Sequence, residues 1–157
     1  MSYDTASLEP FYRYPTTTIL QEYFVPPEAV ENFLKEFWEI INKYNVNLLN
    51  VSLRYVKKTD LPVLNFAPSN RIAVVLYLNI GNNKTSLDYG KYWTRLLIDL
   101  VNQYGGTYYL PYLPFATLSQ FRLSYPNWHD YLEFKKRYDP KLRLSNEFLE
   151  KYILNNS

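Results

Sequence analysis

Two residues of opposite charge, Glu22 and Arg54, have the types and the spacing to act on a small polar ligand. Each lies in a stretch where polar and apolar residues alternate, as along a β-strand with one buried face. If the apolar residues of both strands face one core, both charges emerge on the opposite face of the same sheet. They would lie two strand spacings apart, about 10 Å. We therefore expect them to flank a ligand rather than to pair; the alternative is two solvated charges on a wet sheet face.

A second group of residues that could take part in chemistry is the aromatic segment Gly106 to Phe115, which includes Tyr109 and Tyr112. It is too interrupted by proline for a helix and too aromatic for an ordinary exposed loop, so it should pack against something. Aromatic residues make up 18% of the chain. Most of them suit amphipathic packing, because tyrosine offers a large apolar body and a polar tip, and a few could line a ligand site.

Composition excludes several other classes of function. Cysteine is absent and His129 is the only histidine, which rules out disulfides, thiolate chemistry, a Cys-linked flavin and a multi-His metal site. The 17 basic and 15 acidic residues are spread along the chain, so nothing points to nucleic acid. No signal peptide and no apolar run near 20 residues is found, so we expect a soluble protein without an integral membrane segment, cytoplasmic or peripheral to a membrane.

The elements that must position these residues follow a β-α-β-β-α-β order. We expect strands at Thr16 to Val25, Asn47 to Lys57, Arg71 to Ile80 and Thr107 to Leu110, and helices from Pro27 to about Tyr44 and from about Ser86 or Asp88 to Gly105. The third strand is nearly all apolar, which is typical of a strand covered on both faces. This order predicts an α+β, ferredoxin-like sheet with two helices on one face. The other face is left for a ligand or a partner.

Beyond Pro114 the pattern changes to short helices separated by proline. We expect them at Thr117 to Tyr125, Asn127 to about Arg137 and Ser145 to Ile153. The predicted organisation is a leader (1–15), a cap or substrate-binding domain (16–114) and a C-terminal helical segment (115–157).

Four stretches, taken in order and spacing, carry a family resemblance. They are Leu20 to Pro26, Asn47 to Tyr55, Gly105 to Tyr112, and the ending from Phe121 through Lys135 to Asn146. Together they resemble the C-terminal part of the vanillyl-alcohol-oxidase-type flavoproteins, near sugar-lactone and alditol oxidases and decaprenylphosphoryl-ribose oxidase. The resemblance extends from about Thr16 to Ile153.

This resemblance implies a cap domain whose open sheet face lies over the isoalloxazine ring of FAD. In such enzymes a separate N-terminal domain binds FAD, and an alcohol carbon of a sugar, polyol or lactone-like substrate is oxidised by hydride transfer to the flavin. No flavin-binding half is recognisable in this sequence. The expected partner is therefore an FAD-binding domain or chain, and the chain alone should be catalytically silent.

The resemblance also implies roles for five residues. Glu22 takes a position where the family places Glu or Gln toward the substrate, and it could accept the substrate hydroxyl proton. Arg54 matches a cationic substrate-binding position, Ile72 a pocket-lining one, and Tyr109 an aromatic close to flavin and substrate. Tyr112 replaces a lysine of the decaprenylphosphoryl-ribose oxidases, so it can donate a hydrogen bond or act as a weak acid but brings no positive charge.

Two other functions fit the same topology. The chain could be a non-catalytic remnant or binding module that uses the open sheet face for a ligand or a protein. RNA-recognition modules share the strand order, but Arg71 to Leu78 lacks their glycine and aromatic pattern and no basic patch accompanies it.

Overall fold

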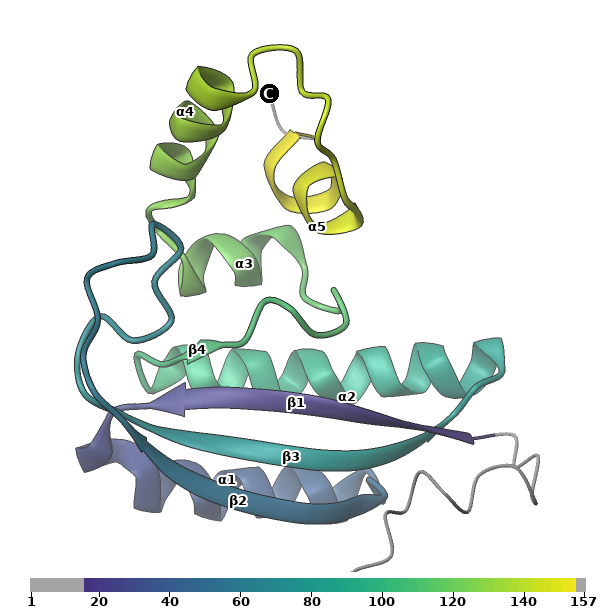
Figure 1. The fold of residues 1–157 in the computed structure, drawn as a ribbon. Helices are drawn as coiled ribbons and strands as arrows, with labels where there is room; N and C mark the ends of the chain where they lie inside the picture. Colours follow the sequence, from purple (N-terminus) through teal and green to yellow (C-terminus); the bar gives the residue numbers. More distant parts are fainter. Residues whose placement is uncertain (1–15, 155–157) are drawn as a thin grey trace, which may run out of the picture.

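A four-stranded antiparallel sheet organises the computed structural model, which describes residues 16–154 (Figure 1). The strand order is β2-β3-β1-β4, so the first strand is central and the third lies beside it. The strands are β1 (Thr16–Val25), β2 (Leu48–Val56), β3 (Arg71–Gly81) and β4 (Thr107–Tyr108). The α+β class and the expected order of strands and helices are confirmed.

Two helices cover one face of this sheet and lie behind it in Figure 1. They are α1 (Val30–Lys43), which follows a 3-10 turn η2 (Pro27–Ala29), and α2 (Lys84–Gln103). Helix α1 buries Phe33, Phe37 and Ile41, which recur every four residues and so share one face of the helix. Helix α2 begins before the expected Ser86 because the side chain of Asn83 accepts a hydrogen bond from the Ser86 N–H and caps the first turn.

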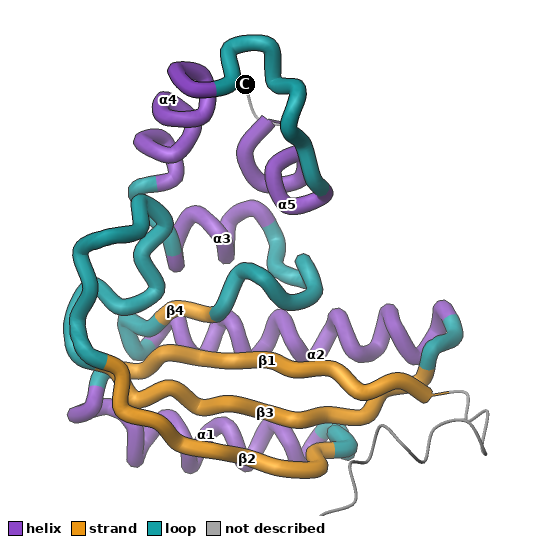
Figure 2. The backbone as a smooth tube through the Cα atoms, viewed as in Figure 1, coloured by secondary structure: helices purple, strands orange, loops and turns teal. Residues whose placement is uncertain are grey.

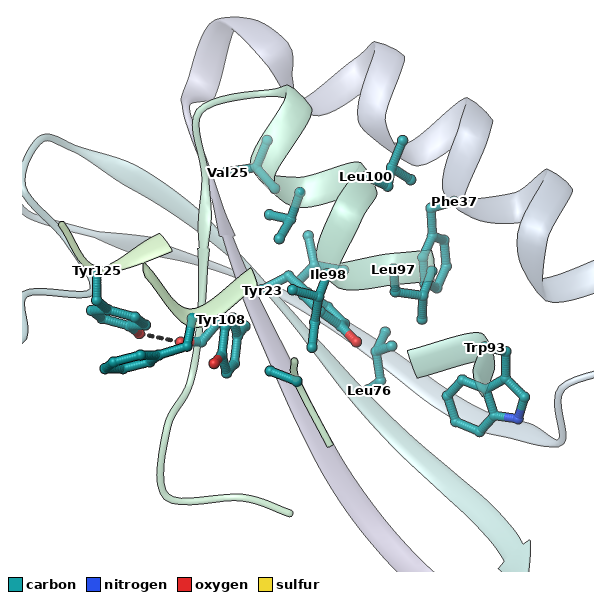
Figure 3. Close-up of a cluster of buried hydrophobic side chains, with 14 of the residues drawn as sticks. Tyr23, Val25, Phe37, Leu76, Trp93, Leu97, Ile98, Leu100, Tyr108 and Tyr125 are labelled. Carbon is teal, nitrogen blue, oxygen red and sulfur yellow. Dashed lines mark hydrogen bonds between the residues drawn. The ribbon is translucent and has the colours of Figure 1, made fainter. Parts of the chain in front are cut away.

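A helical extension follows β4 and lies along that edge of the sheet (Figure 2). It consists of α3 (Leu118–Ser124), α4 (Trp128–Tyr138), α5 (Glu147–Leu149) and the π-helical turn η3 (Glu150–Leu154). Phe121 and Tyr152 are fully buried in the same core as the sheet. Figure 3 shows the O–H of Tyr125 donating to the carbonyl oxygen of Tyr108. Residues of the extension and of the sheet therefore share one core.

Two strands differ from expectation. Alternate residues of β3 are buried against the helices. On the other face Ala73 is buried but Val75, Tyr77 and Asn79 are half-buried, so β3 is covered on both faces only near its start. No described helix packs on that face to bury them. Strand β4 ends at Tyr108 rather than Leu110 because the chain turns away toward Pro111, although the N–H of Tyr109 still donates to the Glu22 carbonyl oxygen at 2.9 Å.

The turn after α4 is held by one carboxylate. Asp139 accepts a hydrogen bond from Lys135 Nζ at 2.8 Å and from the backbone N–H groups of Arg143 and Leu144, each at 2.9 Å. The lysine bond, followed by the two backbone bonds, lowers the pKa of Asp139 to about 2. Ionised Asp139 therefore joins the end of α4 to the segment that leads to α5.

The low pKa predicts how stability changes in acid. A carboxylate whose pKa is depressed in the folded state contributes stability above its unfolded pKa, near 3.8, and loses it as the pH falls toward 2. We expect Asp139→Asn to be less stable than the parent at pH 6 and the difference to shrink by pH 2.5, measured by urea unfolding. Asp60→Asn is the control, because Asp60 is an exposed partner of Lys58. Equal differences at the two pH values would contradict the assignment.

Two glycines allow a matched test of backbone packing. At Gly106 an added Cβ would lie 2.5 Å from the Phe24 carbonyl oxygen and 3.0 Å from that of Val101, whereas at Gly90 in α2 the nearest atom is 3.8 Å away, on Ile80. We expect Gly106→Ala to cost about 2 kcal/mol or more, because backbone atoms must move. Gly90→Ala should gain about 0.5–1 kcal/mol from helix propensity. Urea unfolding of both variants checks the opposite signs.

Candidate functional site

The side chains of Glu22 and Arg54 lie on the sheet face that no described helix covers. In the antiparallel register Glu22 is opposite Val75 of β3, and Arg54 is opposite Ala73. Side chains directly across a ladder point to the same face, and Ala73 and Val75 are two residues apart on one strand. Both charges therefore share the face away from α1 and α2, as the alternation along their strands predicted.

The two side chains pair directly. Arg54 Nη2 lies 2.6 Å from Glu22 Oε1. The expectation that they would flank a ligand without pairing is therefore wrong. The strand spacing was right, but Arg54 crosses β3 over the small side chain of Ala73, and a long guanidinium side chain can cover that distance.

The pair is unequally exposed. The side chain of Glu22 is 6% exposed and that of Arg54 is 61% exposed. The alternative of two solvated charges is therefore wrong for Glu22, whose carboxylate lies in the sheet surface with Arg54 as its partner. The guanidinium, with its planar fork of donors, stays open to a ligand on its outer side.

Tyr109 and Tyr112 border this pair. The backbone of Tyr109 bonds to that of Glu22, and its ring meets the ring of Tyr112 edge-on with centroids 5.2 Å apart. Burial raises the pKa of the Tyr112 phenol, and the nearby Glu22 and Tyr109 raise it further, while Arg54 partly opposes them. Tyr112 thus keeps its proton at neutral pH and can donate a hydrogen bond. The four residues form one cluster, which we call the Glu22–Arg54 site.

The sequence did not single out Phe66 as part of this region. Phe66 lies in the loop between β2 and β3, and its ring is 4.7 Å from that of Phe24 and 5.9 Å from that of Tyr109, measured between centroids. The hydroxyl of Thr107 donates to the Phe66 carbonyl oxygen at 2.7 Å and fixes the loop to β4. An apolar aromatic residue in a proline-punctuated loop was the available signal, because such a residue is seldom left in solvent.

Ile72 is not brought into this cluster. It lies between Val25 and Tyr55 in the sheet register, and Val25 is fully buried in the core. The side chain of Ile72 therefore points toward the helix side of the sheet, away from Glu22.

A groove of about 490 Å³ adjoins the site on the side of Tyr112. The first strand, the segment after β4 and the start of α5 line it; the residues are Ile19, Leu20, Leu110, Pro111, Tyr112, Leu113, Pro114, Asn146, Glu147 and Phe148. Most of these side chains are apolar, so the groove offers an apolar surface next to the polar Glu22–Arg54 site.

Two other properties bear on function. Among residues 16–154, no three His, Asp or Glu side chains gather closely enough to hold a metal ion. No helix in the same range has the length and apolar character to cross a membrane.

Comparison with known proteins identifies a family to which this chain is similar. The family model described as D-arabinono-1,4-lactone oxidase matches residues 12–152, which include every residue of the Glu22–Arg54 site. The search of curated proteins found no match. The family match confirms the resemblance to the C-terminal region of FAD-linked sugar-lactone oxidases.

The ion pair predicts a specific pattern of stability. Arg54→Met should cost about 1–2 kcal/mol, because it leaves the Glu22 carboxylate without a partner, while exposure of Arg54 limits the loss. Adding Glu22→Gln should recover part of that loss, because a neutral amide needs no counter-charge. Urea unfolding of the two single variants and the double variant measures the coupling. Lys58→Met is the matched control at an exposed pair. If Arg54→Met costs the same with Glu or Gln at position 22, the pair contributes nothing.

Proposed function

Because this chain belongs to the D-arabinono-1,4-lactone oxidase family, we propose that it forms the substrate-binding part of an FAD-linked oxidoreductase. The enzyme would oxidise an alcohol carbon of a sugar, polyol or lactone-like substrate. The observation that carries this proposal is the Glu22–Arg54 pair on an uncovered sheet face, with the phenol of Tyr112 beside it. Such a set offers donors and an acceptor to a molecule rich in hydroxyl groups.

Each residue has a distinct role in the proposal. Arg54 binds substrate oxygens with the donors that face solvent. Glu22 holds the guanidinium in place and accepts the proton of a substrate hydroxyl that binds beside the pair. Protonated Tyr112 donates a hydrogen bond to a second substrate oxygen, and Tyr109 packs against Tyr112 and places it.

The half-buried part of the sheet face away from α1 and α2 suits a flat cofactor ring. Val75 and Tyr77 of β3 are half-buried there, and Tyr109 stands at the edge. These side chains offer an apolar area beside the ion pair, which suits one face of an isoalloxazine ring. Bound FAD would supply the hydride acceptor. Residues of this chain would bind and orient the substrate and handle its proton.

An FAD-binding domain is the proposed partner, packing on the helical segment 115–157. Leu123 of α3, Tyr138 of α4 and Leu144 are largely exposed on that segment. Large apolar side chains on one helical extension support a contact surface there.

The test pairs this chain with an FAD-binding domain of the same family and follows flavin absorbance at 450 nm without oxygen. Sugar lactones and polyols should bleach the flavin of the assembled pair. The chain alone should neither bind FAD tightly nor oxidise these substrates. Arg54→Met should raise the substrate concentration that gives half-maximal flavin reduction by about tenfold or more, and Lys58→Met should not. Unaided oxidation by the chain would contradict the need for a partner. If lactones shift the melting temperature of the chain and no flavin domain confers turnover, the binding-module alternative is supported instead.

A further inference from the structure

A second group of charges lies outside the Glu22–Arg54 site. Lys91 and Arg95 are one turn apart on α2, and Lys151 lies in η3 at the end of the helical extension. All three side chains are half-buried. The fold brings them together from segments more than 50 residues apart, where they meet beside the chain that follows Tyr112.

Two neighbouring carbonyl groups hold two of these cations. Arg95 Nε donates to the Phe115 carbonyl oxygen at 2.9 Å, and Lys151 Nζ donates to the carbonyl oxygen of Pro114. Because the carbonyls belong to successive residues, the guanidinium and the ammonium group are fixed close to each other. The carbonyl of Ala116 accepts from Tyr152, so this stretch of chain is held firmly.

The cluster has too few negative charges. Within residues 16–154, none of the three cations lies within ion-pair distance of a carboxylate. Glu147 is the acid near enough to affect Lys151. Burial and then the charges of Lys91 and Arg95 lower the pKa of Lys151, and Glu147 only partly opposes them.

Donors remain available on all three side chains. The bond to Phe115 uses Nε of Arg95 and leaves the Nη groups, which form the fork that binds oxyanions in a bidentate manner. Lys151 makes one hydrogen bond, and its Nζ also lies over the Tyr152 ring, 4.9 Å from the centroid. Lys91 makes no hydrogen bond with a described residue. The Nη atoms of Arg95 and Nζ of Lys91 have no hydrogen-bond partner among the described residues and are not enclosed, so a small ion can reach them.

We propose that Lys91, Arg95 and Lys151 form a binding site for a phosphate group. Several donors converge from two elements, and a tetrahedral dianion can accept from all of them, whereas a carboxylate presents only two oxygen atoms. The site is separate from the proposed flavin chemistry and does not depend on it. Phosphate bound there would offset the surplus positive charge beside Pro114 and Phe115.

The test uses the full chain, labelled with ¹⁵N, titrated at pH 7 with inorganic phosphate and, in parallel, with glycerol 3-phosphate, at ionic strength held constant with NaCl. We expect saturable shifts confined to the amides near Lys91, Arg95, Phe115 and Lys151. Tighter binding of one probe tells whether the free ion or a phosphate ester is preferred. Lys91→Gln, which removes no hydrogen bond between the residues that the structure describes, should weaken binding by about tenfold.

The control is Lys84→Gln, which removes the same charge from the first turn of α2 and should leave binding unchanged. Arg95→Gln should weaken binding at least as much as Lys91→Gln. Shifts that never saturate, or that follow every lysine of the surface equally, would overturn the proposal. Wild-type affinity in Lys91→Gln would do the same, and Arg95 and Lys151 would then serve only to hold the carbonyl groups of Phe115 and Pro114.

Discussion

Strand β1 contributes to the core with one face and to the Glu22–Arg54 site with the other. Tyr23 is buried against the helices and its O–H donates to Gln21, whose amide donates to Thr94 of α2, so the helix side of β1 is fixed by hydrogen bonds as well as packing. Glu22 lies between these two residues and points the opposite way. A register slip of one residue would exchange the faces and place a carboxylate in the core. The stability of the core therefore also fixes the orientation of the site.

Aromatic side chains around the end of β4 also point alternately to the two faces of the sheet. Tyr108 is buried beside Tyr125, while its neighbour Tyr109 packs on Phe24 and Phe66 on the sheet face away from α1 and α2. The high tyrosine content is thus divided between the core and the border of the site. Beyond Tyr109 the chain is no longer part of the sheet. Its carbonyl groups at Pro114 and Phe115 accept hydrogen bonds from side chains of η3 and α2 instead of from a neighbouring strand.

Local patterns in the sequence were enough to predict the order of the strands and the face on which Glu22 and Arg54 lie, but not the half-buried outer part of β3 or the early end of β4. Alternation placed Glu22 and Arg54 on one face, and the glycine at position 105, with φ 64°, ends α2 as expected. The direct ion pair was not predictable, because it depends on the diagonal offset across β3 and on a small side chain at Ala73. Phe66 was missed for a similar reason, since the course of a long loop follows from tertiary contacts. The family resemblance named Tyr109 and Tyr112, and the structure brings both to the pair.

The closed pair also bears on which ligands Arg54 can accept. Glu22 is an internal competitor for the guanidinium, already in place and nearly buried. An anionic ligand would have to displace it, bringing a second negative charge next to a carboxylate whose one ion-pair partner among residues 16–154 is Arg54. A neutral molecule with several hydroxyl groups can instead bond to both members at once, leaving the pair intact. Under the proposed function, Glu22 would therefore favour neutral, hydroxyl-rich substrates over anionic ones at this site.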